Sequence, residues 1–164
     1  MCSVAVALVV CWAPDVRADG FDDFDEQAQA YRKAKRLVDT EPARAVELTT
    51  ELVEHGDRSV KQLYFSLHAD ALLEVGRLRE ARDMNAAVAD AFPDSQLAPI
   101  AAVRAAELSA LIGQEKRLED LIDVADSRAM EVLEDGPQRR FVVGRALRLE
   151  HDLLVARGMP DEAA

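Results

Sequence analysis

The order of apolar and polar residues predicts a chain built from helices. After Glu26, apolar residues recur three and four positions apart and not two apart, which is the spacing of one α-helical face. Gly and Pro interrupt this spacing and divide it into eight helical stretches. We expect them at about Phe24–Asp39, Ala43–His55, Ser59–Gly76, Leu78–Ala91, Ser95–Gly113, Leu118–Val132, Val142–Ala156 and, as a short beginning, from Pro160.

The expected helix ends carry residues with known terminal preferences. Ser59 and Ser95 stand where a side-chain oxygen can cap the third and fifth helices. Pro99 falls in the first turn of the fifth helix, where a missing N–H costs little. Gly76 ends the third helix, because glycine tolerates a left-handed turn.

Neighbouring amphipathic helices joined by tight turns form hairpins. Each hairpin has one apolar stripe that it cannot bury by itself, so it must stack on the next hairpin. We therefore predict an all-α fold of stacked antiparallel helical hairpins, an α-solenoid of about seven helices plus an incomplete eighth.

One segment carries a recognisable repeat. Gln62–Ser95 spans 34 residues and resembles a tetratricopeptide (TPR) repeat. Asn85 departs from that family, which places a large apolar residue there. The residues that match the family's pattern are Phe65, Ala69, Leu72, Gly76, Ala81, Val88 and Pro93. The resemblance implies a solenoid in which the first helix of each hairpin lines a concave, partner-binding groove.

The other copies of the repeat are weaker. The turn glycines Gly76, Gly113 and Gly158 are not 34 residues apart, so the later repeats are expected to have longer helices. The junction Phe92–Ala101 resembles the junction between repeats in TPR proteins of the bacterial cell envelope. The residues that sketch further copies are Tyr31, Pro42, Ala45 and Leu52; Ala102, Ala106, Gly113, Leu118 and Ala125; and Phe141, Leu154, Gly158 and Ala163.

Composition narrows the class of partner. The chain has 164 residues, of which 49% are apolar and only 5% aromatic, which favours close helix packing over a sandwich of strands. Its net charge is −11. An acidic protein gains nothing from phosphate-rich partners, so we expect no nucleic-acid binding and no attraction to an anionic membrane surface.

The N-terminal residues predict export. Ser3–Ala13 is a short uncharged apolar run, and Val16 and Ala18 suit a signal peptidase that cuts before Asp19. No Lys or Arg precedes the run, so a misassigned start or a buried apolar helix stays an alternative. The expected organisation is a signal peptide over 1–18, an acidic lead-in over 19–26 and a TPR-like domain over 27–164.

Both cysteines, Cys2 and Cys11, lie in the predicted signal peptide, so the mature chain has no thiol chemistry. Cys11 could instead carry a lipid, although Val10 is a poor residue for a lipoprotein signal. Membrane contact is expected only in that case.

The sequence offers no constellation typical of an enzyme. The histidines are His55, His68 and His151, and none has partners at a metal-binding spacing. Ser66, His68 and Asp70 are two residues apart, so on a helix they point away from one another. We expect no enzyme activity, no cofactor and no metal, and we expect His68 to be a partly buried helix residue.

The candidate binding residues follow from the TPR resemblance. Positions that would face the groove alternate in charge, a pattern that suits an extended or helical peptide. The plainer interpretation is that these charges belong to ordinary solvated helix faces. The predicted partner-binding residues are Arg32, Arg36, Leu67, Asp70, Glu74, Arg104, Glu107, Arg145 and Arg148, with Asp152 beside them and apolar spots at Leu63 and Ile100.

The last helix raises a question of completeness. Without a following helix, we expect Val142, Leu149 and Leu153 to be partly uncovered, so the chain either belongs to a longer protein or docks on another subunit. We predict an exported adaptor or scaffold that binds a protein in the periplasm or cell envelope. The alternatives are the N-terminal recognition arm of a larger envelope enzyme or signalling protein, and a structural piece that self-associates through its C-terminal end.

Overall fold

A computed structural model of the chain describes residues 24–159. Within this range it contains seven α-helices, one 3-10 helix and no strand, so the all-α prediction is confirmed. The elements are α1 (Phe24–Leu37), α2 (Pro42–His55), η1 (Arg58–Val60), α3 (Lys61–Glu74), α4 (Leu78–Ala91), α5 (Ala98–Leu111), α6 (Glu115–Val132) and α7 (Pro137–Ala156). The predicted signal peptide and the start of an eighth helix at Pro160 lie outside the described residues.

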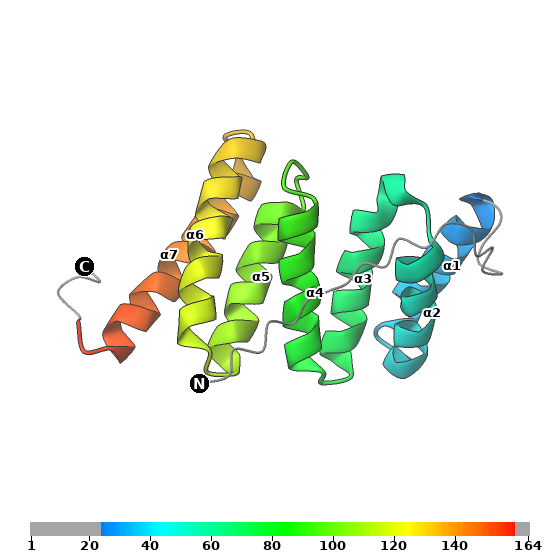
Figure 1. Cartoon of the computed structure of the whole chain (residues 1–164), viewed down its shortest axis with the longest axis horizontal. Coiled ribbons are helices and arrows are strands. Elements are labelled where there is room, and N and C mark those ends of the chain that lie inside the picture. The colour runs from blue at the N-terminus through cyan, green and yellow to red at the C-terminus, as the bar shows by residue number, and fades with distance from the viewer. Residues whose placement is uncertain (1–23, 160–164) are drawn as a thin grey trace, which may run out of the picture.

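The helices stack in chain order, from α1 and α2 at one end to α7 at the other (Figure 1). Every helix packs against the next one, and α5 also touches α7. This arrangement is a solenoid of antiparallel hairpins, in which α1, α3, α5 and α7 are the first helices and α2, α4 and α6 the second helices. The helices α1 to α5 have 14 residues each, whereas α6 has 18 and α7 has 20, which confirms the longer later repeats.

The first helices α3, α5 and α7 end in the same turn. Gly76, Gly113 and Gly158 have φ values of 76°, 71° and 76°, which confirms the left-handed conformation expected at Gly76. After each glycine, the next backbone N–H donates to the carbonyl five residues earlier: Arg77 to Leu72, Gln114 to Ser109, and Met159 to Leu154. This is the Schellman motif, which satisfies the last carbonyl groups of a helix.

The two predicted serine caps are wrong. The side chain of Asp57 accepts a hydrogen bond from the Ser59 N–H at 2.7 Å, which starts η1 and delays α3 until Lys61. Ser95 Oγ accepts from the Leu97 N–H at 3.1 Å, in the turn before α5, and neither α3 nor α5 has a side-chain cap. Pro99 does stand in the first turn of α5.

The main core lies between α4 and α7. α5 is buried almost all round, because its many alanines let α4 and α6 approach closely. A smaller cluster joins Ala30, Leu52 and Tyr64 at the α1 end. There, Gln27 Oε1 accepts from the Asp57 N–H at 2.7 Å and the Tyr64 hydroxyl at 3.2 Å.

The predicted partial exposure of α7 is confirmed for Leu149 and wrong for Val142 and Leu153. Val142 and Leu153 are buried and Leu149 is half-buried against the core, because this side of α7 packs on α5 and α6. The large apolar side chains that α7 exposes are Phe141, Leu147 and Val155.

Candidate functional site

Ion pairs join successive first helices. Arg104 in α5 donates to Asp70 in α3 at 2.8 Å, across 34 residues of sequence. Arg145 in α7 donates through Nε to Glu107 in α5 at 2.5 Å, across 38 residues. The first helices therefore carry residues of opposite charge that meet from one repeat to the next.

The electrostatic surroundings of Asp70 extend this arrangement to α1. Burial raises the pKa of Asp70, and the guanidinium of Arg104 opposes the rise. Glu74 also raises the pKa of Asp70, and Lys35 in α1 lowers it. Burial, and to a lesser degree the charge of Asp70, raises the pKa of Tyr31 in α1. The Tyr31 ring lies 6.1 Å from the ring of Tyr64 in α3, so this face of α1 meets α3. Lys35 follows Tyr31 by one helical turn and stands on the same face of α1.

Arg32 and Arg36 lie elsewhere on α1. Both are exposed, and both line a hollow of about 420 Å³ that Leu48 of α2 also borders. On a helix they stand about 100° round from Tyr31 and Lys35. The predicted α1 residues therefore lie on a different face of α1 from Tyr31 and Lys35.

The remaining predicted residues differ in accessibility. Leu67 is 5% exposed, so it belongs to the core and offers no surface to a partner. Leu63 is exposed, and Ile100 is half-buried against the main core. Glu74 and Arg148 are exposed, and neither forms an ion pair within residues 24–159.

We give the name charged row to seven of the charged residues on the first helices, namely the members of the two ion pairs between first helices together with Lys35, Glu74 and Arg148. The sign of the charge changes along the stack. The member on α1 is a cation, both members on α3 are acids, α5 carries one of each sign, and both members on α7 are cations. The members are Lys35, Asp70, Glu74, Arg104, Glu107, Arg145 and Arg148.

The charged row remains open to solvent. The side chains of Arg104 and Asp70 are 46% and 41% exposed, so a partner can reach groups that are already paired. The guanidinium carbon of Arg145 also lies 5.6 Å from the centre of the exposed Phe141 ring. A partner at this point would meet both charge and an aromatic surface.

His68 is held inside the stack by a contact with the preceding hairpin. It is 9% exposed, and its Nδ1 lies 2.8 Å from the hydroxyl of Thr49 in α2. The same hydroxyl lies 2.7 Å from the Ala45 carbonyl. One hydroxyl proton serves one acceptor, so both contacts are satisfied when Thr49 donates to Ala45 and the His68 N–H donates to Thr49. Burial lowers the pKa of His68, and nearby Arg77 lowers it further.

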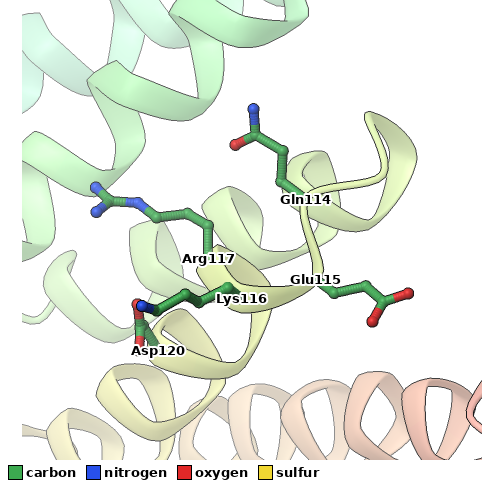
Figure 2. Close-up of a pocket in the computed structure, with 5 residues that line it drawn as sticks. All are labelled: Gln114, Glu115, Lys116, Arg117 and Asp120. Atoms are coloured by element: carbon green, nitrogen blue, oxygen red, sulfur yellow. The ribbon is translucent and has the colours of Figure 1, made fainter. Parts of the chain in front are cut away.

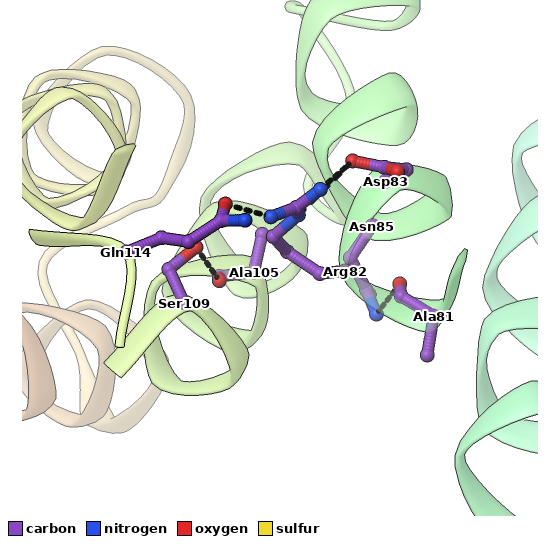
Figure 3. A network of polar contacts seen from close by, with 7 residues as sticks. All are labelled: Ala81, Arg82, Asp83, Asn85, Ala105, Ser109 and Gln114. Atoms are coloured by element: carbon purple, nitrogen blue, oxygen red, sulfur yellow. Dashed lines mark hydrogen bonds and ion pairs between the residues drawn. The ribbon is translucent and has the colours of Figure 1, made fainter. Parts of the chain in front are cut away.

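A second polar network was not found by sequence reasoning (Figure 3). Arg82 in α4 is 9% exposed and donates to Gln114 in the α5–α6 turn and to Asp83 beside it. The sequence did contain a signal for this network, because the cation Arg82 directly follows Ala81, on the face of α4 that packs against neighbouring helices. This network ties one hairpin to the next.

Asn85 lies buried in the same helix. Its Nδ2 donates to the Ala81 carbonyl at 2.9 Å, while its Oδ1 has no partner among the described residues. The departure from the TPR pattern therefore places a polar amide in the packing layer.

Two further hollows lie near α6. One, of about 420 Å³, is lined by Gln114, Glu115, Lys116, Arg117 and Asp120 (Figure 2). Gln114, Glu115 and Arg117 point in different directions there. The other, of about 250 Å³, lies between the α5–α6 turn and α7; its apolar lining includes Leu118, Leu149 and Leu153.

Within residues 24–159, no group of three or more His, Cys, Asp or Glu side chains is placed to hold a metal ion. None of the helices in that range combines the length and apolar character needed to cross a membrane.

Comparison with protein-family models, with curated proteins and with solved structures finds no match to this chain. The TPR resemblance therefore stays a prediction.

Proposed function

We propose that this chain is an exported TPR-like adaptor that binds an extended or helical segment of another protein along the charged row. The observation that carries the proposal is the row itself, in which charges of both signs from α1, α3, α5 and α7 are exposed or half-buried along one stack.

Such a row suits a polypeptide better than a small molecule. Its groups are spread over four helices, whereas a small-molecule site needs polar groups that converge in one cavity. A polypeptide with alternating charges can exchange the internal partners of Asp70 or Arg145 for its own side chains. Charge-assisted hydrogen bonds of this kind give geometric specificity as well as affinity.

The proposal is tested by site-specific photo-crosslinking in the cells that make the protein. A photoreactive residue replaces Glu74 or Arg148, because both are exposed and neither change breaks an ion pair within the described residues. The control position is Glu51, which is exposed on the second helix α2.

We expect both row positions to give one adduct of the same mass, recovered in the cell-envelope fraction, and Glu51 to give none. The proposal fails if neither row position gives an adduct, or if Glu51 gives the same one. An adduct recovered only from the cytoplasm would contradict export of the chain but would leave the proposed binding along the charged row in place.

A further inference from the structure

The smaller of the two hollows near α6 reaches from solvent to the main core. Its volume is about 250 Å³, and it lies between the α5–α6 turn and α7. We call it the apolar hollow. Leu118 and Leu153 are buried members of the main core, and Leu149 is half-buried against it. The apolar walls are made by Ala110 of α5, by Leu118 of α6, and by Leu149, Leu153 and Ala156 of α7.

The α7 wall of the apolar hollow belongs to a helix face that stays open in a complete hairpin. α5 and α7 end in the same turn, so their residues can be matched by counting back from Gly113 and Gly158. Although α6 follows α5, the α5 counterparts of this wall remain exposed or half-buried. The pairs of corresponding residues are Leu149 and Arg104, Asp152 and Glu107, and Ala156 and Leu111.

The size of the apolar hollow suits one large side chain. Sites for small molecules usually have volumes of about 300–1,000 Å³, so this hollow is smaller than most of them. A side chain such as Phe that enters it would contact Leu118, Leu149 and Leu153 and would remove their apolar surface from water. Anchors of this kind, seated in a pocket, carry much of the affinity of protein interfaces.

The charges around the apolar hollow indicate what stands beside the anchor. Glu115 and Asp152 also line it, and no Lys or Arg does. Glu115 lies 3.5 Å from Arg157, which also donates to Glu119. Asp152 is exposed and forms no ion pair within residues 24–159. A basic residue next to the anchor would therefore meet a carboxylate that is not yet paired with a described residue.

The apolar hollow also continues the charged row. Arg145, Arg148, Leu149 and Asp152 are spaced three, one and three residues apart, so they share one face of α7. Arg145 and Arg148 belong to the charged row. Along this face, over about 10 Å of helix, the surface changes from cations through the hollow to a carboxylate.

We propose that the apolar hollow takes a large apolar side chain of the segment that binds the charged row. An acidic residue on one side of this anchor meets Arg145 and Arg148, and a basic residue on the other side meets Asp152. The inference rests on the proposed function, because it names what the partner carries at the α7 end of the row. In an extended segment, every second side chain points the same way and four steps span about 13 Å, so the motif is acidic, any, apolar, any, basic.

The test is a titration of the full chain, labelled with ¹³C in its leucine methyl groups, with short blocked peptides observed by NMR. The probe is Ser-Glu-Ala-Phe-Ala-Lys-Ser. The comparison peptides carry Glu at both charged positions, Lys at both, or Ala in place of Phe, so the result does not depend on the direction in which a peptide lies. We expect the probe to shift the methyl resonances of Leu118, Leu149 and Leu153 and to bind at least about fivefold more tightly than each comparison peptide.

Two variants separate docking from unfolding. Ala110→Leu should weaken binding of the probe at least about fivefold by narrowing the hollow, with an unchanged melting temperature, because α3 has Leu73 at the corresponding position. Asp152→Lys should make the peptide with two Glu residues the tightest binder, a gain that unfolding cannot produce. The matched control is Ala43→Leu, at an exposed residue of α2, which should leave binding unchanged.

Tightest binding of the peptide with two Lys residues would mean general attraction to an acidic chain, and would overturn the proposal. So would the absence of methyl shifts with any peptide, or an unchanged order of affinities in Asp152→Lys. Shifts that occur only in a chain shortened to Met159 would assign the hollow to residues 160–164 and would also overturn it. These measurements report on the hollow alone, so their failure leaves the crosslinking at Glu74 unaffected, and a failure of that crosslinking leaves the peptide result unchanged.

Discussion

At the scale of single residues, the contact between His68 and Thr49 joins the first two hairpins through a buried polar pair. The pair is satisfied while the imidazole is neutral. Protonation would place a charge among the apolar residues that surround α3, where burial disfavours it.

This contact predicts a pH dependence of stability. In the unfolded chain the pKa of His68 is near its ordinary value of about 6.5, and in the folded chain burial lowers it. The unfolded state therefore binds more protons in this range, and stability falls as the pH drops through 6.5 toward the folded pKa. We expect the free energy of unfolding, measured with urea, to decrease between about pH 7.5 and pH 5.5.

The variant His68→Gln should remove most of this dependence of the free energy of unfolding on pH. The variant His55→Gln, at an exposed residue, should keep it. A slope that survives in His68→Gln would show that another group is responsible.

Single residues were also the hardest features to predict from sequence. Leu67 and Leu63 are both apolar members of α3 four residues apart, yet one is buried and the other exposed, because neighbouring helices cover only part of each face. Arg82 is charged and yet buried, since Gln114 from another hairpin satisfies it. Such outcomes depend on contacts between repeats, which the pattern within one helix does not contain.

At the scale of elements, the first helices are joined by ion pairs at spacings close to the repeat length. Asp70–Arg104 links α3 to α5, and Glu107–Arg145 links α5 to α7. These pairs are solvent-exposed, so each is expected to add only about 0.2–1 kcal/mol to stability. Their larger effect is to fix the order of charges along the row.

A charge-swap cycle tests the Asp70–Arg104 pair. Asp70→Arg alone places two guanidinium groups together and should lower the free energy of unfolding by about 1 kcal/mol. Adding Arg104→Asp should recover most of that loss, because the reversed pair can form. Urea denaturation of the single and double variants measures the recovery.

Arg79→Asp, a change at an exposed residue of α4 outside the row, serves as the control and should give no recovery with Asp70→Arg. Equal recovery from the control would mean that the two charges do not interact.

The elements themselves were well predicted by spacing and by glycine. Helix ends at Gly76, Gly113 and Gly158 followed from the intolerance of other residues for positive φ. The serine caps failed for two reasons: Asp57 accepts from the Ser59 N–H and starts η1 ahead of α3, and Ser95 Oγ accepts from the Leu97 N–H in the turn before α5. The charged row was partly predicted, since Asp70, Glu74, Arg104, Glu107, Arg145 and Arg148 came from repeat positions; Lys35 was missed because the first repeat is weakly marked.

At the scale of the whole molecule, stability is distributed unevenly along the stack. The main core spans α4 to α7, whereas α1 and α2 contribute to small clusters around Leu52 and Leu72. In a stack where each repeat mainly touches its neighbours, the less packed end opens first.

Native-state hydrogen exchange should therefore show α1 and α2 losing protection at lower denaturant than α5. Simultaneous loss of protection in all seven described helices would instead indicate one cooperative unit.

Recognition along the charged row is tested most directly by the charge-swapped variant Asp70→Arg with Arg104→Asp. This variant keeps an internal ion pair and so is expected to keep its melting temperature, but it presents the opposite order of charges to a partner. The measurement is the yield of the photo-crosslinked adduct at Glu74, compared with the chain that has the native pair. We predict at least about a tenfold fall in yield with an unchanged melting temperature. An unchanged yield would contradict recognition through these charges.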